Sequence, residues 1–554
     1  MKKLLIGIFL FALFLRTYKL TEFPVGFHGD EANVGYNAYS LLKTGKDKNG
    51  VFLPLSIDQW GDFRPAGYHY LAIIPTALLG VSELAVRLPA AIFGALSVIF
   101  LFLLIKELFG DEKTALIGAT LLAISPWHIN TSRSTSESII ALFLVIAGTY
   151  LFLKGIKSSK FSLILAYTCF IFSLFFYHAA RFFIPVWLLF LTAISLFFNK
   201  TPEPKIKKFL LLGGLFFFVI FIIIFIFSRG TSRPLDISIF NNQETQLILE
   251  EQIREDGGAN VIFTRAFHNK IIAYLLTFFN NYLRHFSGDF LFIKGGLPPR
   301  YIIPWSGNLY PVELPFLVLG LSLLISALFK ERKFLLSLPL VWLLLGPIPA
   351  ALTYEDIPNI QRSLMTIPAF IIIIAYGINA LLQLINLKIL KILLSILIAF
   401  LFAYNLMGFM HNYFHHSLTH QPWYRNAGEK ELTNLVKKYS EQNYQFIMSA
   451  HGDNNLIFYL FYLKIDPKYY QDLGSPRDKD GLRFQNLLFL NKDCPAKDVV
   501  EEKLPTNDKT LYVNQGTCPV MKNYQILQII KRPDGTPAFQ VVRIKASQPT
   551  DKEN

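Results

Sequence analysis

Long apolar runs separated by short polar connections dominate the first 410 residues of the chain. The runs "LAVRLPAAIFGALSVIFLFLLI" and "FLLLGGLFFFVIFIIIFIF" reach or approach the roughly 20 residues that a membrane-spanning helix needs. The pattern predicts a polytopic α-helical membrane protein with about eleven transmembrane helices. One helix is expected at the N-terminus, and the others at about 84–105, 114–130, 136–153, 161–179, 182–198, 209–228, 311–329, 334–352, 364–386 and 389–410.

The apolar run after Met1–Lys3 has no small-residue cleavage site behind it, so we expect an uncleaved first helix rather than a signal peptide. Two long polar stretches, at about 16–83 and 229–310, interrupt the predicted spans. The first of them contains "YHYLAIIPTALLGV", which is too short to cross a bilayer and predicts an interfacial or re-entrant helix.

Basic residues are distributed unevenly between the two sets of connections. If the N-terminus is cytoplasmic, the short outer connections hold only Arg133, Arg181 and Arg362, whereas the inner ones are rich in lysine. Under the positive-inside rule, this predicts a multi-pass protein of the plasma membrane with its tail outside the cytoplasm. The inner set comprises Lys106, Lys113, Lys154, Lys157, Lys160, Lys200, Lys205, Lys207, Lys208, Lys330, Arg332, Lys333, Lys388 and Lys391.

The tail, residues 411–554, alternates short apolar strands such as "YQFIMSA", "TLYVNQ" and "FQVVRI" with the helix-like stretch "EKELTNLVKKYSEQ". We interpret it as a small extracytoplasmic α/β domain that follows a membrane domain of residues 1–410. Cys494 and Cys518 both lie in this tail, and they are expected to pair if the compartment is oxidising, which the sequence leaves open.

Composition agrees with membrane residence, because only 17% of residues are charged, against roughly 25% in a soluble domain. The net charge of +14 could indicate nucleic-acid binding. Much of that charge lies in the short loops between apolar runs, which excludes this interpretation.

Ionisable residues outside these loops gather at the predicted outer face, where they would form a cavity under the two long polar stretches. A carboxylate beside several arginines suits deprotonation of a hydroxyl while a phosphate leaves. A transporter should instead carry charges near the midplane and paired broken helices. The alternative is a set of interfacial salt bridges between helix ends. The set is Asp30, Glu31, Arg64, Arg133, Glu137, His178, Arg181, Glu355, Asp356 and Arg362.

The segments "FHGDEANVGYNAYSLLKTG", "RPAGYHYL" and "SELAVRLPAAIFGALSVIFLFLL" resemble the N-terminal half of the GT-C glycosyltransferases. The branch they resemble most contains the protein O-mannosyltransferases and the bacterial aminoarabinose transferase of lipid A. The shared features are an acidic pair (Asp30–Glu31), a basic residue before proline (Arg64–Pro65) and an "RLP" motif at Arg87. "YHAARFFIP", "GGLPPRYIIP" and "GPIPAALTYEDIPNIQRSLMTIPA" extend the resemblance over most of residues 1–410. The "WWDYG"-type motif of the oligosaccharyltransferase branch is missing from the sequence.

The resemblance implies that Asp30 is the catalytic carboxylate and that Glu31 is its neighbour in the site. We expect Glu31 to raise the proton affinity of the pair, since two close carboxylates resist double ionisation. The alternative role for Asp30 is to cap a helix that begins near Ala32. The resemblance further implies donor-phosphate contacts from Arg64, Arg133, Arg181 and Arg362, and supporting roles for Glu137, Tyr177, His178 and Arg300.

The sequence therefore predicts an inverting glycosyltransferase that takes a sugar from a polyprenyl-phosphate donor to a hydroxyl of a protein, lipid or glycan at the outer face of the membrane. Its expected partners are that donor, the acceptor and membrane lipid, with no nucleic acid. No cofactor is indicated, and a divalent metal is left open. The alternatives are a flippase or exporter of lipid-linked sugars, or a membrane-anchored binding protein.

Overall fold

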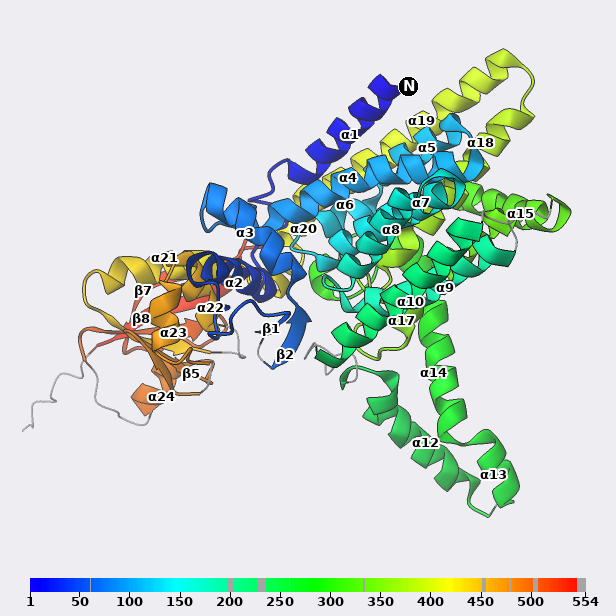
Figure 1. Ribbon diagram of the computed structural model, residues 1–554. Coiled ribbons are helices and arrows are strands. Elements are labelled where there is room, and N and C mark those ends of the chain that lie inside the picture. The colour runs from blue at the N-terminus through cyan, green and yellow to red at the C-terminus, as the bar shows by residue number, and fades with distance from the viewer. Residues whose placement is uncertain are drawn as a thin grey trace, which may run out of the picture.

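A bundle of long helices and a smaller mixed α/β domain make up the protein in the computed structural model (Figure 1). The structure describes every residue except 60, 198–203, 228–235, 259, 332–333, 451–454, 478–479, 502–506 and 546–554. Lys200, Arg332 and Lys333 of the predicted inner connections, and residues 229–235 of the second polar stretch, lie outside this part. The bundle contains α1 (Lys2–Thr17), α4 (Glu83–Phe109), α5 (Glu112–Ile124), α6 (Pro126–Ser132), α7 (Glu137–Ser158), α8 (Lys160–Ser173), α9 (His178–Phe197), α10 (Pro204–Phe227), α15 (Leu314–Glu331), α16 (Ser337–Leu345), α17 (Ile348–Ala351), α18 (Ile367–Leu384) and α19 (Lys388–His411).

Helices coincide with all eleven predicted spans, and the prediction of a polytopic helical membrane protein is confirmed. Within the described residues, eight helical segments are long and apolar enough to cross a membrane. The remaining three predicted spans correspond to the shorter helices α1, α5 and α8, of 16, 13 and 14 residues. The helix α5 is short because Pro126 follows it and occupies the first turn of the separate helix α6, whose N-cap is Ser125.

The bundle has two chemically different ends. At one end, Lys106 pairs with Glu112, Lys157 pairs with Glu107 at 2.7 Å, and Asn379 donates to Asp111. We call this the lysine end. The opposite end carries the first residues of α4, α7, α9 and α18, together with the segments between α1 and α4; we call it the aspartate end because Asp30 lies there.

The chain between α1 and α4 folds over the aspartate end. It forms α2 (Gly29–Thr44), a two-stranded ribbon of β1 (Ser56–Gln59) and β2 (Asp62–Pro65), and α3 (Gly67–Leu79). The 13-residue α3 is the predicted short helix, and it is too short to cross a bilayer.

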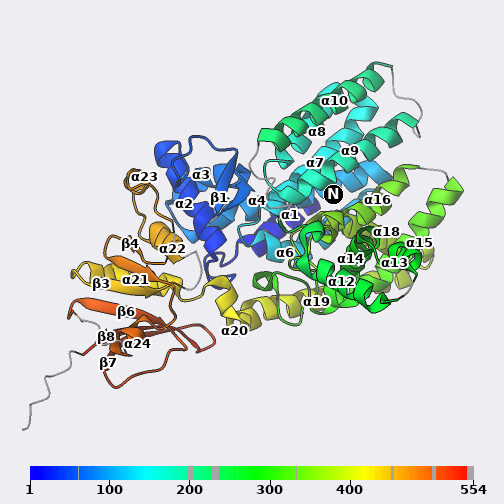
Figure 2. The same cartoon turned by 90° about the horizontal axis from the view of Figure 1, so that it is seen from below.

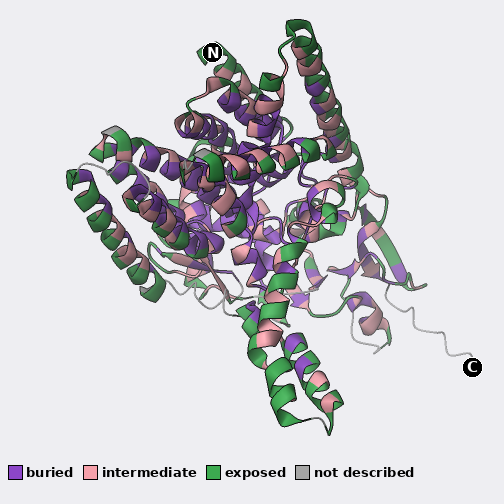
Figure 3. Cartoon of the chain, turned by 90° about the vertical axis from the view of Figure 1, so that its right-hand side faces the viewer, coloured by how far each residue is buried: buried purple, intermediate pink, exposed green. Residues whose placement is uncertain are grey.

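The second polar stretch contains α12 (Gln243–Asp256), α13 (Val261–Phe267) and α14 (Lys270–Arg284), which project from the bundle as an arm. Most of this arm is exposed (Figure 3). Short turns that include η3 (Asp289–Ile293), η4 (Pro299–Tyr301) and η5 (Pro311–Glu313) then return the chain to the bundle and bring Arg300 to the aspartate end.

The C-terminal part folds around a six-stranded mixed sheet with the order β4-β5-β3-β6-β8-β7, which confirms the predicted α/β domain (Figure 2). Strand β3 is parallel to β5 and β6, and the outer pairs are antiparallel. The predicted pairing of Cys494 with Cys518 is confirmed. The elements are α21 (Glu429–Ser440), β3 (Gln445–Ser449), α22 (Asn455–Tyr462), α23 (Pro467–Asp472), β4 (Leu482–Phe484), β5 (Leu487–Leu490), α24 (Pro495–Glu501), β6 (Thr510–Gln515), β7 (Tyr524–Lys531) and β8 (Pro537–Ile544).

The C-terminal domain is attached to the bundle through α2. A Cβ on Gly35 would come within 2.3 Å of the Phe461 ring, so α2 and α22 touch at a position that only glycine permits. Tyr36 donates a hydrogen bond to the carbonyl of Ile465 at 3.2 Å. Gln471 donates to the Asp47 carbonyl at 2.8 Å. The helix that carries the acidic pair is thus held on its outer side by the C-terminal domain.

Candidate active site

The first turn of α2 holds the side chains of Asp30 and Glu31 so that they point in different directions. The N-cap is His28, whose Nδ1 accepts a hydrogen bond from the Asp30 amide at 3.1 Å. In return, the Glu31 carboxylate accepts from the His28 amide at 3.3 Å, which completes a capping box. The hypothesis that Asp30 caps a helix is therefore wrong, because His28 and Glu31 cap it and the Asp30 side chain is left to face other groups. Both carboxylates lie in the first turn, where the helix dipole favours negative charge.

Asp30 faces two arginines from other segments and the histidine that caps its own helix. Its Oδ2 lies 3.2 Å from Nη1 of Arg64 on β2, 3.4 Å from Nη2 of Arg300 in η4 and 3.5 Å from Nδ1 of His28. Burial alone would raise the pKa of the Asp30 carboxyl, but its interactions with Arg64 above all, and with His28 and Arg300, outweigh burial and hold the pKa well below its usual range. Burial and the nearby Arg300 lower the pKa of His28, so its imidazole is neutral at pH 7.

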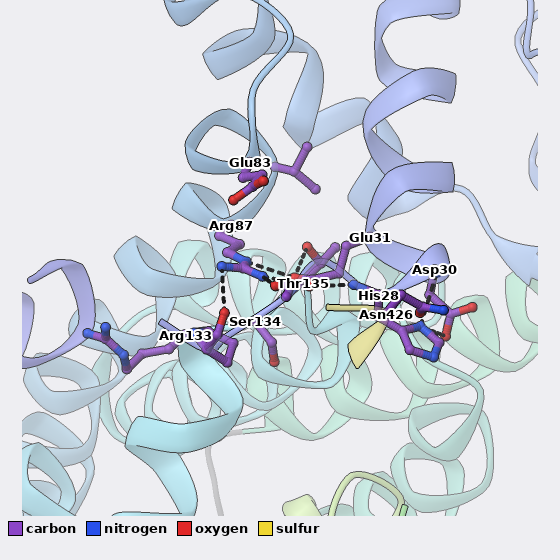
Figure 4. A network of polar contacts seen from close by, with 12 residues as sticks. His28, Asp30, Glu31, Glu83, Arg87, Arg133, Ser134, Thr135 and Asn426 are labelled. Carbon is purple, nitrogen blue, oxygen red and sulfur yellow. Dashed lines mark hydrogen bonds and ion pairs between the residues drawn. The ribbon is translucent and has the colours of Figure 1, made fainter. Parts of the chain in front are cut away.

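Glu31 points into the protein and joins α2 to the bundle (Figure 4). Its carboxylate accepts from Arg87 Nε at 3.1 Å and Nη2 at 2.9 Å, and from the amide and hydroxyl of Thr135, each at 3.0 Å. Burial raises the pKa of Glu31, and Arg87 more than offsets this, so the pKa lies below its usual value. The expectation that Glu31 raises the proton affinity of the pair is wrong, because each carboxylate is ionised against its own arginine.

A cavity of about 260 Å³ opens beside Asp30 at the aspartate end. It brings together residues from α2, β2, α7, α9 and the turns before α18. Its lining includes seven of the predicted site residues, namely Asp30, Arg64, Glu137, Tyr177, His178, Arg300 and Arg362. Glu31 lies outside it and lines a smaller neighbouring chamber together with Asp30, Tyr301 and Arg425.

Arg362 is oriented toward the cavity by its own loop. Its amide donates to Asn359 Oδ1 at 2.8 Å, and its Nη1 donates to Thr353 Oγ1 at 2.9 Å and to the Glu355 carbonyl at 2.6 Å. Three arginines from three segments therefore line one cavity with a carboxylate. Such guanidinium groups can bind a phosphate through paired hydrogen bonds and stabilise charge on it as a bond breaks.

Residues 64–227 match the family described as dolichyl-phosphate-mannose-protein mannosyltransferase. Two Bacillus subtilis proteins named as candidate mannosyltransferases, YkcB and YycA, are 28% identical over 103 residues and 29% identical over 159 residues. These matches cover 19% and 28% of this chain, and only 14% and 22% of the relatives' own length.

Among solved structures, ArnT from Cupriavidus metallidurans bound to undecaprenyl phosphate aligns over 99% of this chain and 98% of its own, with a TM-score of 0.51 at 11% identity. The oligosaccharyltransferase AglB from Archaeoglobus fulgidus, in complex with an inhibitory peptide and a dolichol-phosphate, aligns over 93% of this chain and 69% of its own. Its TM-score is 0.52 at 13% identity. Residues 64–227 thus resemble the mannosyltransferase family, and the chain as a whole has the fold of ArnT and AglB. The resemblance to the mannosyltransferase and aminoarabinose transferase branch is thereby confirmed.

Two predicted phosphate ligands do not line the cavity. Arg133 is fully buried, and its guanidinium donates to the carbonyls of Leu15 at 2.8 Å and Tyr18 at 2.7 Å and to the Tyr413 hydroxyl at 3.1 Å. Arg181 is also buried and donates through Nε to the Leu174 carbonyl at 3.0 Å. Both arginines join helix ends through hydrogen bonds to carbonyl oxygens.

Several residues that line the cavity or contact its arginines were not predicted from the sequence. His28 stands directly before the acidic pair in "FHGDEA", and Asp62, two residues before Arg64, lies 3.3 Å from its Nε. Gln361 precedes Arg362 and donates to the Tyr301 hydroxyl at 2.6 Å. Each of these residues stands within two positions of a residue that was predicted, and this proximity was the signal that could have identified them. No group of three or more His, Cys, Asp or Glu side chains suited to a metal ion occurs in the described part of the chain.

Proposed function

We propose that this protein transfers a sugar from a polyprenyl-phosphate carrier to a hydroxyl group of a protein, lipid or glycan. The observation that carries the proposal is the placement of Asp30 between Arg64 and Arg300 on a cavity that Arg362 also lines. The comparisons support the donor class, because the matched family is described by a dolichyl-phosphate-mannose donor. ArnT and AglB were solved with undecaprenyl phosphate and dolichol-phosphate respectively.

The arginines supply the donor site in this proposal. Arg64, Arg300 and Arg362 come from separate segments, so a phosphate can be contacted from several directions at once. As the bond between the sugar and the phosphate breaks, negative charge accumulates on the phosphate oxygens. The three fixed guanidinium groups stabilise that charge and thereby lower the barrier.

Asp30 acts as the base. Its carboxylate is ionised and accessible to the cavity, so it can accept the proton of the acceptor hydroxyl. A phosphate that binds Arg64 and Arg300 competes for the cations that now hold Asp30, and its negative charge raises the proton affinity of the carboxylate. Donor binding thus makes Asp30 a stronger base at the moment when the base is needed.

The reaction is a single displacement with inversion at the sugar. The acceptor oxygen forms a bond to the anomeric carbon, the bond from that carbon to the phosphate oxygen breaks, and the proton of the hydroxyl passes to Asp30. Lipid phosphate leaves with the electron pair. Glu31 takes no part in this transfer and instead fixes the first turn of α2 through Arg87.

We further propose that the aspartate end faces away from the cytoplasm, because the lysines gather at the other end. Single cysteines at Lys205 and Ser475, in a Cys169→Ser background, test this orientation. In intact cells an impermeant thiol reagent should label Ser475→Cys and leave Lys205→Cys unlabelled. Labelling of Lys205→Cys alone would show that the opposite end of the bundle faces outward.

The central experiment incubates the purified protein with a panel of polyprenyl-phosphate sugars and candidate acceptors and measures release of lipid phosphate. Wild type should release it with at least one donor, and Asp30→Asn should lower the rate by about 10²–10⁴-fold, the usual contribution of a positioned base. Asp289→Asn is the matched control, since this carboxylate pairs with Lys294 at the surface. Unchanged turnover in Asp30→Asn would refute the mechanism. Movement of the donor across proteoliposomes without release would favour the flippase alternative.

A further inference from the structure

A second cavity, of about 560 Å³, lies at the lysine end between α5, α18 and α19. It exists because the first part of α19 stands away from the bundle: the buried residues of this helix are Ile398, Phe402 and Phe409, and none precedes Ile398. The groove therefore runs along the outside of the bundle, where lipid surrounds a membrane protein.

Polar and apolar groups are separated along this groove. Its outer part carries Lys113, Gln383 and Lys391, at the terminal turns of the three helices. From Lys391 to Ala399 the groove follows eight residues of α19, which corresponds to about 12 Å of depth along the helix. The deeper wall is apolar and is formed by Leu116, Ile117, Leu382, Ile392, Ile396 and Ala399.

Within the described part of the chain, neither lysine of the groove has a carboxylate within ion-pair distance, although Lys113 is close enough to Asp111 for its charge to help lower the pKa of that carboxyl. Asp111, the nearest acid in sequence to Lys113, already accepts from the amide and hydroxyl of Thr114 at 3.0 and 2.7 Å and from Asn379 at 2.9 Å. Glu112 pairs with Lys106. The mouth of the groove is thus a positively charged site above an apolar channel.

We propose that this groove binds an anionic phospholipid, with its phosphate between Lys113 and Lys391 and an acyl chain along the apolar wall. Basic pockets between transmembrane helices recognise anionic headgroups by this combination of charge and depth. The site lies at the opposite end of the bundle from Asp30, and its occupant is a structural lipid rather than the donor of the transfer reaction.

The test is native mass spectrometry of the full-length chain in detergent, titrated with phosphatidylglycerol or phosphatidylcholine of identical acyl chains. Wild type should bind phosphatidylglycerol more tightly. Each lysine near an anionic surface contributes roughly five-fold, so Lys113→Gln/Lys391→Gln should weaken phosphatidylglycerol binding by about 25-fold and leave phosphatidylcholine binding unchanged. The control Lys207→Gln/Lys208→Gln removes the same charge from exposed positions on α10 and should bind as wild type does.

Ala399→Trp fills the deep end of the groove without changing charge, and it should weaken binding of both lipids. Glycerol phosphate, which has the headgroup chemistry but no acyl chain, should fail to compete. Equal affinity of wild type for the two lipids, or unchanged phosphatidylglycerol binding in Lys113→Gln/Lys391→Gln, would overturn the proposal. Full competition by glycerol phosphate would also overturn it, since it would reveal a site for a free phosphate.

Discussion

Replacement of Glu31 by glutamine should destabilise the protein far more than replacement of its neighbour Asp30 by asparagine. The Glu31 side chain is 5% exposed and its partner Arg87 is fully buried. All the groups that face the carboxylate are donors: two nitrogens of Arg87, the amide and hydroxyl of Thr135 and the amide of His28. An amide at this position keeps one acceptor oxygen and turns a donor nitrogen toward other donors.

The size of this loss of stability depends on the hydrogen bonds that Arg87 keeps when Glu31 is replaced. Removing one partner of a buried ion pair costs about 3–5 kcal/mol, because the other charge remains buried. Arg87 also donates to the carbonyls of Leu20 at 3.1 Å, Pro24 at 3.2 Å and Gly26 at 2.6 Å, which still compensate part of its charge. We therefore expect a loss at the lower end, about 3 kcal/mol.

Heating of the detergent-solubilised protein, followed by size-exclusion chromatography of the folded fraction, measures this loss. The unfolding entropy is roughly 2.1 cal/mol/K per residue, so a loss of about 3 kcal/mol in a chain of 554 residues should lower the apparent midpoint by about 2–3 °C. Glu31→Gln/Arg87→Met removes both charges and should recover part of the midpoint. If Glu31→Gln unfolds at the wild-type temperature, or if the double variant is less stable than both single variants combined, the ion pair does not hold α2 to the bundle.

Three further predictions concern charge and covalent structure. Arg64→Ala should weaken donor use strongly and Arg64→Lys should restore it only in part, because an ammonium cannot reproduce the planar fork; unchanged donor affinity in Arg64→Ala would remove this residue from the site. The folded-state pKa of Asp30 is depressed, so its contribution to stability is present above the ordinary aspartate pKa of about 3.9 and is lost as pH falls below it. The difference in stability between wild type and Asp30→Asn should therefore be constant near pH 7 and shrink below about pH 4, and a difference that stays constant in acid would contradict this. Reduction of Cys494–Cys518, which are 24 residues apart, should cost about 3 kcal/mol, and an unchanged thermal midpoint after reduction would contradict this.

Hydropathy and helix ends made much of the architecture predictable. Apolar runs locate helices whatever their partners are, so every predicted span coincides with a helix. Asp30, Arg64 and Arg362 could be grouped because antiparallel helices bring alternate connections to the same end. The strands β3, β6 and β8 were predicted, but β4, β5 and β7 were not. The strands β4 and β5 have only three and four residues and carry no distinct period, and register shifts interrupt the pairing of β7 with β8.

The direction in which each side chain points could not be predicted from the sequence. Arg133 and Arg64 are both arginines at the predicted outer face, yet Arg133 is enclosed by carbonyls of α1 and the turn after it, whereas Arg64 faces the cavity. Glu31 and Asp30 are adjacent and chemically alike, but successive helical positions point about 100° apart and meet different arginines. These differences arise from tertiary packing.

The attachment of the C-terminal domain to α2 has a consequence for how such proteins can be recombined. The segment that carries the acidic pair also forms the surface on which α22 and α23 lie, through Gly35, Tyr36 and Gln471. Replacing residues 411–554 by the tail of a relative would leave Gly35 opposite an unrelated side chain and would loosen the helix that presents Asp30. A working chimera would have to exchange α2 together with the tail. The segments that must be kept together in this protein are therefore α2 and residues 411–554, which are far apart in the sequence.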